Sequence, residues 1–129
     1  MNLDFLSPVL MLYSAFFVEW DFLICPSYSM AAFPKDESMP MAERTILLDG
    51  EPIPYWKSQF WPILTNTAYL PSTTFPCGFG STSKMPIGLN VVGPEYSDML
   101  TIDFARLLKT ECGFGFVAPP MAMGTEPKL

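Results

Sequence analysis

Runs of apolar residues, separated by prolines and polar clusters, predict a mixed fold of helices and strands. Ser7-Pro8 is a good helix start, and nearly every position from 9 to 18 is apolar. This pattern predicts a helix over 8–18 that other parts of the protein cover on several sides. Residues 22–25 form a short apolar run halted by Pro26. A run without polar positions is typical of a strand buried on both faces, so we expect an interior strand here.

Residues 26–54 are rich in prolines and charged residues, which predicts an irregular connection. Within it, the segment 44–48 runs into Asp49-Gly50, a pattern that favours a short edge strand entering a turn. The connection is too apolar for a free linker. We therefore expect it to lie over a larger body.

The middle of the chain predicts one more helix and two strands. Apolar residues at helical spacing predict a helix over 55–66, in which Pro62 should cause a kink. Strands are expected over 72–76 and 87–92. The loop between them is rich in Gly, Ser and Pro, so the two strands should form a hairpin-like pair.

The last regular element is a helix predicted over 98–111, with Ser97 as its cap and Gly113 as its stop. The tail over 113–129 has three prolines and little pattern. Together these elements place the chain, residues 1–129, in the α/β class as one unit: a partial mixed β-sheet with covering helices.

The composition fits a folded chain and excludes several classes of function. Of the 129 residues, 50% are apolar and 15% aromatic, which argues against intrinsic disorder. A net charge of −6 would repel phosphate polyanions, so we expect no nucleic-acid partner. Because the chain contains no histidine, it cannot by itself build a Ser-His-Asp triad, a Cys-His dyad or a histidine-containing zinc site.

The cysteines and the apolar N-terminal run indicate in which compartment of the cell the protein is located. Cys25, Cys77 and Cys112 are odd in number and far apart, which suggests neither a disulfide scaffold nor a zinc site. We interpret them as small buried residues of a cytoplasmic protein. The run over 3–17 follows no basic residue and is shorter than the roughly 20 apolar residues of a membrane span. We expect no signal peptide, membrane span, metal or cofactor.

Two short motifs resemble known catalytic or binding loops. Residues 81–84 read S-T-S-K and match the S-x-x-K pattern, in which Ser and Lys share one face of a helical turn. Here the pattern falls in the predicted hairpin loop shortly before Pro86, so a solvated turn is the better interpretation. Gly78-Phe79-Gly80 lacks the third glycine and the helix of a phosphate-binding loop. A loop glycine with positive φ explains it better.

The remaining clusters also have an ordinary structural explanation. One aromatic cluster could line a substrate pocket, although core packing is the favoured interpretation; it consists of Tyr55, Trp56, Phe60 and Trp61. The acidic pairs Asp36-Glu37 and Glu19/Asp21 lack a partner for acid–base work and are interpreted as solvated charge. The residues alone thus identify no catalytic group, and the substrate-binding residues stay unknown.

Two longer segments carry a family resemblance. Residues 66–78 (NTAYLPSTTFPCG) and 85–94 (MPIGLNVVGP) resemble the C-terminal part of amidase signature enzymes. That family shows an N-L-A-G-L-P-A-type segment, a strand ending P-x-G, and then L-P-I-G-x-Q-x-x-G-P. Upstream, residues 20–26 (WDFLICP) are similar to the family's D-x-L-L-x-P strand. The resemblance covers the chain from about residue 10 to about residue 120.

The chain departs from the family at several positions. Asn90 stands where the family usually has Gln, Tyr69 where it often has Gly, and Pro62 falls inside a helix that the family keeps whole. The family hydrolyses amides with a Ser–cis-Ser–Lys triad around a Gly/Ser-rich segment. Residues 80–83 are not that segment, so the catalytic residues cannot be carried onto any position of this chain.

The resemblance implies a C-terminal fragment of the amidase signature fold, from an enzyme that cleaves carboxamide C–N bonds. We expect the chain to be inactive alone, as a truncated or fragmentary gene product without the triad region. The implied partners are a small-molecule amide in the full-length enzyme and a separate N-terminal amidase chain that complements this one. A different interpretation is a non-catalytic binding module that docks on a partner through apolar surface.

Overall fold

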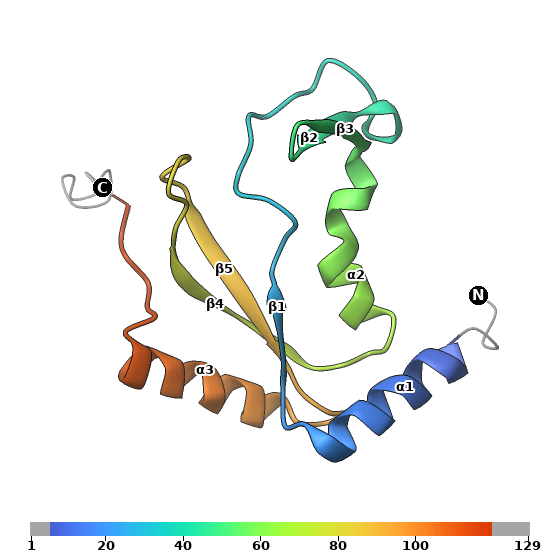
Figure 1. Ribbon diagram of the computed structural model, residues 1–129, viewed down its shortest axis with the longest axis vertical. Helices are drawn as coiled ribbons and strands as arrows, with labels where there is room; N and C mark the ends of the chain where they lie inside the picture. Colours follow the sequence, from blue (N-terminus) through green and yellow to red (C-terminus); the bar gives the residue numbers. More distant parts are fainter. Residues whose placement is uncertain (1–5, 120–129) are drawn as a thin grey trace, which may run out of the picture.

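The computed structural model describes residues 6–119 of the chain. A three-stranded sheet lies between helices, and a two-stranded hairpin stands beside it (Figure 1). This arrangement confirms the α/β class expected from the sequence. The elements are, in order, α1 (Leu6–Glu19), β1 (Leu23–Pro26), η2 (Met41–Glu43), β2 (Thr45–Leu48), β3 (Glu51–Pro54), η3 (Tyr55–Gln59), α2 (Phe60–Asn66), β4 (Ser72–Phe79), β5 (Pro86–Val92) and α3 (Asp98–Cys112).

β5 is the central strand of the larger sheet, whose order is β1-β5-β4 with both pairs antiparallel (Figure 1). β4 continues to Phe79, beyond the end at 76 expected from the sequence, because a bulge between Pro76 and Gly78 restores the pairing after the proline. Gly78 has a φ of 143° at this bulge. The positive φ predicted for a glycine of this segment is therefore confirmed, in a strand rather than in a loop.

β1 lies at the edge of the sheet, so the prediction of an interior strand is wrong for the described part of the chain. Its backbone shows which groups the open edge presents. Ser27 N donates to Gly88 O at 3.3 Å. Because hydrogen-bonded and non-bonded pairs alternate along an antiparallel ladder, Cys25 bonds to β5 and the N–H and C=O of Ile24 face outward. The Ile24 side chain is 48% exposed.

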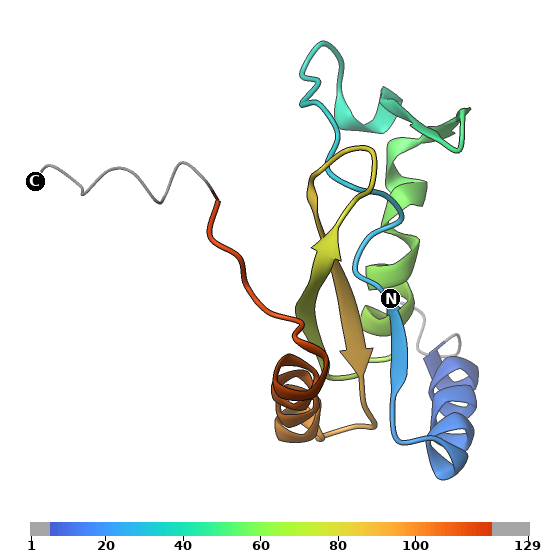
Figure 2. The same ribbon diagram turned by 60° about the vertical axis from the view of Figure 1, so that its left-hand side comes forward.

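The helices cover both faces of this sheet (Figure 2). α1 and α2 lie on one side, where a small core joins four buried residues and several half-buried ones. The buried members are Cys25, Ala68, Leu70 and Val92, and the half-buried members are Val9, Leu10, Tyr13, Phe17, Leu23 and Trp61. On this face Asn90 is also buried, and its Oδ1 accepts a hydrogen bond from Thr74 Oγ1 at 2.7 Å.

α3 packs on the other face of the sheet (Figure 2). Phe22, just before β1, stacks on Phe104 of α3 with ring centroids 4.3 Å apart. The hydroxyls of Thr73 and Thr101 lie 2.8 Å apart, and Phe75 stacks on Phe114. The sheet therefore has a packed layer on each face, although each layer is small.

The segment 26–54 is more ordered than its predicted irregular structure, because it contains η2 and a hairpin of β2 and β3. The predicted edge strand is present as β2, and Asp49 and Gly50 both have positive φ, as a two-residue hairpin turn requires. The sequence pattern does not predict β3, because this strand contains Pro52 and Pro54. Tyr55 N donates to Arg44 O, so both prolines occupy positions where no ladder donor is needed.

The predicted helix over 55–66 is divided in two, with the 3₁₀ turn η3 followed by α2. Pro62 is the third residue of α2. Amide groups in the first turn of a helix have no acceptor within the helix, so Pro62 removes no hydrogen bond there. The expected kink in a single long helix is replaced by a helix that begins just before the proline.

The C-terminal helix agrees with its predicted stop but not with its predicted cap. Gly113 has a φ of 72°, and its N–H and that of Phe114 both point to Leu108 O. Ser97 makes no side-chain cap; its Oγ donates to Pro94 O at 2.6 Å instead. The tail over 113–129 has no regular structure up to 119, and its remainder lies outside the described residues. None of the helices within residues 6–119 combines the length and the apolar character needed to cross a membrane.

Tyr69 ends α2 in a conformation that glycine usually adopts. Leu70 N donates to Thr65 O and Tyr69 N to Asn66 O, which is the paired pattern of a Schellman motif, and Tyr69 has a φ of 53°. At this position the family that the sequence resembles often has Gly. A β-carbon in the left-handed region costs roughly 1–2 kcal/mol, so Tyr69 strains its own helix end.

We expect Tyr69→Gly to stabilise the chain by about 1 kcal/mol, because the relieved strain exceeds the added freedom of the unfolded chain. The side chain is 64% exposed, so little packing is lost. Urea unfolding followed by tryptophan fluorescence measures the effect. Tyr69→Ala is the matched control, since it keeps the β-carbon and should give no gain. A stabilisation by alanine equal to that by glycine would contradict the explanation.

Candidate functional site

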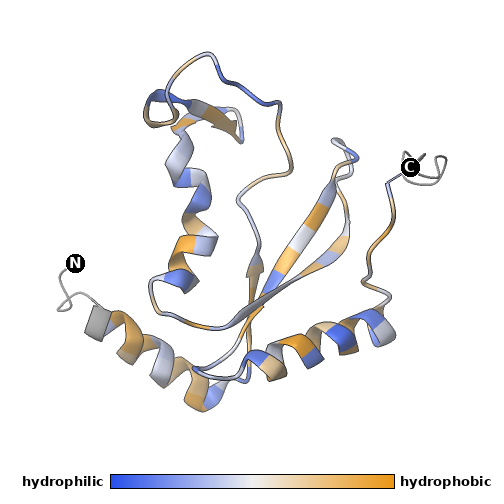
Figure 3. Ribbon diagram, turned by 180° about the vertical axis from the view of Figure 1, so that it is seen from behind, coloured by the Kyte–Doolittle hydropathy of each residue, from blue (hydrophilic) through white to orange (hydrophobic). Residues whose placement is uncertain are grey.

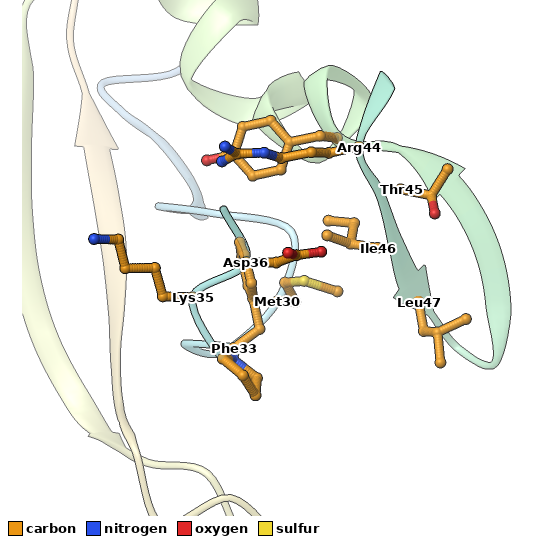
Figure 4. A pocket seen from close by; sticks show the side chains of 10 residues that line it. Met30, Phe33, Lys35, Asp36, Arg44, Thr45, Ile46 and Leu47 are labelled. Carbon is orange, nitrogen blue, oxygen red and sulfur yellow. The ribbon is translucent and has the colours of Figure 1, made fainter. Parts of the chain in front are cut away.

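A pocket of about 360 Å³ lies between the loop that follows β1 and the β2–β3 hairpin (Figure 4). We call it the loop–hairpin pocket. Its volume is near the lower end of the range for small-molecule sites, roughly 300–1,000 Å³. The lining residues are Met30, Phe33, Pro34, Lys35, Asp36, Arg44, Thr45, Ile46, Leu47 and Tyr55.

Aromatic contacts build the apolar wall of this pocket. Phe33 stacks on Tyr28, with ring centroids 6.3 Å apart, and meets Tyr55 edge to face at 6.1 Å. Met30 and Ile46 add aliphatic surface on the same side of the pocket (Figure 4). The wall therefore joins a loop, a hairpin strand and the start of η3.

A buried hydroxyl pair fixes the loop that carries Phe33. Ser58 is fully buried in η3, and its Oγ donates to Tyr55 O at 2.6 Å. Since that bond uses the only proton of Ser58, the hydroxyl of Tyr28 must donate to Ser58 Oγ, with which it forms a short hydrogen bond. Tyr28 thus ties the loop after β1 to η3, and this tie holds the pocket wall in place.

The charged groups of the pocket come from both of its sides. Arg44 Nε donates to Met39 O at 2.8 Å, which fixes the guanidinium while leaving its terminal N–H groups without a hydrogen-bond partner among the described residues. Asp36 Oδ1 accepts bonds from Ser38 N at 2.8 Å and from Ser38 Oγ at 2.6 Å. The Ser38 hydrogen bonds, with a smaller contribution from Arg44, hold the pKa of Asp36 below its usual value.

The pocket therefore presents the N–H groups of Arg44 and the carboxylate of Asp36 beside its apolar wall. Lys35 lines the same pocket, but it forms an exposed ion pair with Glu37 at 2.7 Å, and its side chain extends away from Asp36 and Arg44 (Figure 4). This arrangement suits binding rather than bond cleavage, because none of the lining residues pairs a nucleophile with a base.

The S-x-x-K segment does not have the geometry of a catalytic motif. Residues 81–84 form the exposed turn between β4 and β5, where Lys84 has a φ of 56°. Gly80 N donates to Met85 O, and Lys84 N donates to Gly80 O, both at 2.9 Å. The bond from Lys84 N closes a single turn within the exposed hairpin loop, and the positive φ of Lys84 ends that turn, which agrees with the interpretation as a solvated turn.

The predicted aromatic cluster is divided by the structure. Trp61 packs against the core between the sheet and α1, as favoured from the sequence. Trp56 and Phe60 are exposed, so the core interpretation is wrong for them. Together with Lys57 and Ile63 they line a second, shallower depression beside the hairpin. Tyr55 belongs to the loop–hairpin pocket.

The cysteines also differ from one another. Cys25 is buried, and burial raises the pKa of its thiol. Cys77 is half-buried and Cys112 is exposed, so the prediction of three buried cysteines is right only for Cys25. All three are free thiols.

Sequence reasoning did not find the Arg44–Asp36 arrangement. Glu19, Asp21, Asp36 and Glu37 are all exposed, as the interpretation of solvated charge requires. That interpretation misses the placement of Asp36 opposite Arg44, since the loop between them has no periodicity that would bring the two together. The one available signal was the strand prediction over 44–48, which puts Arg44 at the start of a hairpin.

Comparisons with known proteins agree with the fold. Residues 10–102 match the family model described as Amidase. Two relatives described as subunits of glutamyl-tRNA(Gln) amidotransferase are similar to this chain. The protein of Alkaliphilus metalliredigens is 32% identical over 67% of this chain and 17% of its own length. That of Anaeromyxobacter sp. strain K is 34% identical over 62% of this chain and 15% of its own length.

One solved structure has a similar fold. It is described as an unexpected vestigial protein complex that reveals the evolutionary origins of an s-triazine catabolic enzyme. The superposition has a TM-score of 0.70 at 20% identity and covers 88% of this chain and 24% of that one. This chain therefore spans only a minor part of the proteins it resembles. Because the family model matches well over half of its residues, the chain belongs to the amidase family.

Proposed function

We propose that residues 1–129 act as the C-terminal segment of an amidase signature hydrolase that cleaves the C–N bond of small carboxamides. The chain contributes strands and covering helices to the catalytic body, and the Ser–cis-Ser–Lys groups lie outside these residues. Alone, the chain does not hydrolyse amides. The three free thiols support a cytoplasmic location as part of this proposal.

The open edge of β1 carries this proposal. β1 has the composition of a strand buried on both faces, yet the N–H and C=O of Ile24 face an edge without a strand in the described part of the chain. Exposed edges of apolar strands are usually covered or paired, because they otherwise promote aggregation. A further strand of the amidase body would satisfy both the backbone groups of Ile24 and its side chain.

The outer surface of α1 supports the same conclusion. Met11, Leu12 and Val18 are 71%, 72% and 85% exposed, and α1 is apolar along most of its length (Figure 3). A helix that is apolar all round belongs in the interior of a larger body. α3, by contrast, alternates polar and apolar positions, as expected of a helix with one face in water (Figure 3).

Complementation tests the proposal. The chain would be co-expressed with the segment of the Alkaliphilus or Anaeromyxobacter relative that precedes the matched region, and hydrolysis of a simple aryl amide would be measured. We expect hydrolysis from the pair and none from either part alone. The Ser81→Ala/Lys84→Ala double variant should complement as well as the original chain, because the exposed turn takes no part in the reaction.

Two variants at the sheet edge sharpen the test. Ile24→Pro removes an N–H that faces outward, so it should leave the pairing with β5 intact and abolish complementation. Ile24→Val keeps the N–H and should complement normally. Turnover by the chain alone, or equal activity of the Ile24→Pro pair, would refute the proposal.

The exposed apolar surface of α1 also fits a binding module that docks on an unrelated partner. The two functions differ in what the isolated chain should do. A module should be a monomer that binds little hydrophobic dye, whereas a segment of a larger body should bind such dyes strongly and lose that binding on complementation.

A further inference from the structure

The outer face of α1 carries an apolar stripe with the spacing of a helix–helix contact. Its members are all exposed and follow one another at intervals of three, four and three residues: Pro8, Met11, Ala15 and Val18. This is the spacing of the residues that face the partner helix in a coiled coil. α1 lies at the margin of the molecule, so a second helix can approach the stripe (Figure 2).

The opposite face of α1 is fixed against the rest of the chain. Val9, Leu10 and Phe17 pack against the buried core, and the hydroxyl of Tyr13 donates to Leu64 O at 3.3 Å. The helix cannot turn its apolar stripe inward without breaking these contacts. The stripe therefore has one orientation before any partner arrives, which lowers the entropy cost of association.

The stripe is complementary to itself when two copies of α1 pack in opposite directions. If Met11 of one copy faces Ala15 of the second, the same two-fold axis places Pro8 opposite Val18. The long Met11 side chain then enters the space left by the small Ala15, and every contact occurs twice, as in an isologous interface. Parallel packing would place Met11 against Met11 and Ala15 against Ala15, so that a crowded layer would alternate with an empty one.

The charges of α1 favour the same direction. Residues 6–18 contain no charged residue, so no like charges meet along the stripe. Glu19 lies in the last turn, where a carboxylate is unfavourable for the dipole of its own helix. In the antiparallel pair Glu19 lies beside the first turn of the second copy, whose N–H groups attract a carboxylate. A second copy of this chain therefore supplies a helix start at the place where Glu19 requires one.

We propose that the chain forms a two-fold symmetric dimer in which the α1 helices of two copies pack antiparallel through Pro8, Met11, Ala15 and Val18. The inference goes beyond the proposed function and requires no hydrolysis. The second copy and an amidase body cover the same face of α1, so each excludes the other. A dimer without complementation would refute the proposed function alone, and complementation by a chain that never dimerises would refute the dimer alone.

Sedimentation equilibrium of the full chain, from micromolar to millimolar concentration, tests this inference. We expect a monomer–dimer equilibrium with a dissociation constant in the micromolar range, because a single helix pair buries little surface. The amount of hydrophobic dye bound per chain should fall over the same range of concentrations. A chain that stays monomeric, or that forms large assemblies without a dimer, would overturn the proposal.

Substitutions at exposed positions separate a specific pair from general hydrophobic association. Ala15→Leu makes the stripe more apolar but fills the space that Met11 of the second copy needs, so it should weaken the dimer at least about tenfold. A stronger association of this variant would contradict the packing. Met11→Glu should also weaken the dimer at least about tenfold, because it buries a charge against an apolar residue. Met99→Glu is the matched control, since Met99 is similarly exposed but lies on α3 and should leave the dissociation constant unchanged.

Mixing two variants tests the direction of packing. Met11→Lys and Ala15→Glu should each prevent dimerisation, because each places a charge opposite an apolar residue. An equimolar mixture should form a heterodimer, because the introduced lysine of one chain lies opposite the introduced glutamate of the other. Parallel packing would keep these charges in different layers. Failure of the mixture to associate would therefore overturn the antiparallel arrangement.

Discussion

Replacing Phe75 by alanine is expected to destabilise the chain by about 3–5 kcal/mol, the usual cost of truncating a buried phenylalanine. Phe75 is 4% exposed in β4, and its ring stacks on Phe114 with centroids 6.0 Å apart. The ring thus connects the sheet to the segment that follows α3. Because domains of this size are stable by only about 5–15 kcal/mol, the loss should remove much of the total.

Urea unfolding with circular dichroism measures this loss. Phe79→Ala is the matched control, since Phe79 lies in the same strand but is 53% exposed and should cost less than about 1 kcal/mol. Similar losses for the two variants would show that the face under α3 is not a packed layer. A loss confined to Phe75 would show that this small layer folds as a cooperative part of the chain.

The regular elements of the fold could be predicted because their signals are local. Ser7 lies inside α1, which begins at Leu6, so it is not the predicted cap, but Pro8 falls in the first turn as expected. Pro8, the apolar run over 22–25 and the Gly113 stop each act within one or two turns of chain. The position of β1 in the sheet could not be predicted, because the apolar composition of a strand predicts that it is buried but does not predict which segment of the chain covers it. The same apolar pattern therefore produces an edge strand here.

The errors in the hairpin and at the pocket have a different cause. Pro52 and Pro54 argue against a strand unless their positions in the ladder are known, and those positions depend on the turn at Asp49-Gly50. Asp36 and Arg44 are brought together by a loop without periodicity, through bonds to Ser38 and Met39. Sequence patterns show neither which residues of a strand are hydrogen-bonded to its partner nor how a loop is folded. The candidate site could therefore be found only in the structure.

The attachment of α3 to the sheet leads to the second large effect. Thr101 is buried, and its Oγ1 donates to Asp98 O at 2.8 Å. Because that bond uses its only proton, Thr73 Oγ1 must donate to Thr101 Oγ1, also at 2.8 Å. Thr101→Val should therefore leave the Thr73 hydroxyl without an acceptor and cost about 1–3 kcal/mol, whereas Thr73→Val should cost less than about 1 kcal/mol.

The double variant Thr73→Val/Thr101→Val makes the argument specific, because it removes both hydroxyls and leaves no unpaired donor. We expect it to be more stable than Thr101→Val alone, so the two substitutions should be non-additive in a double-mutant cycle of urea unfolding. Additive losses would show that the two hydroxyls do not interact, and a greater loss from Thr73→Val than from Thr101→Val would reverse the assigned direction of the hydrogen bond. The sign of that coupling reports whether α3 is joined to β4 by a directed polar contact or by apolar packing alone.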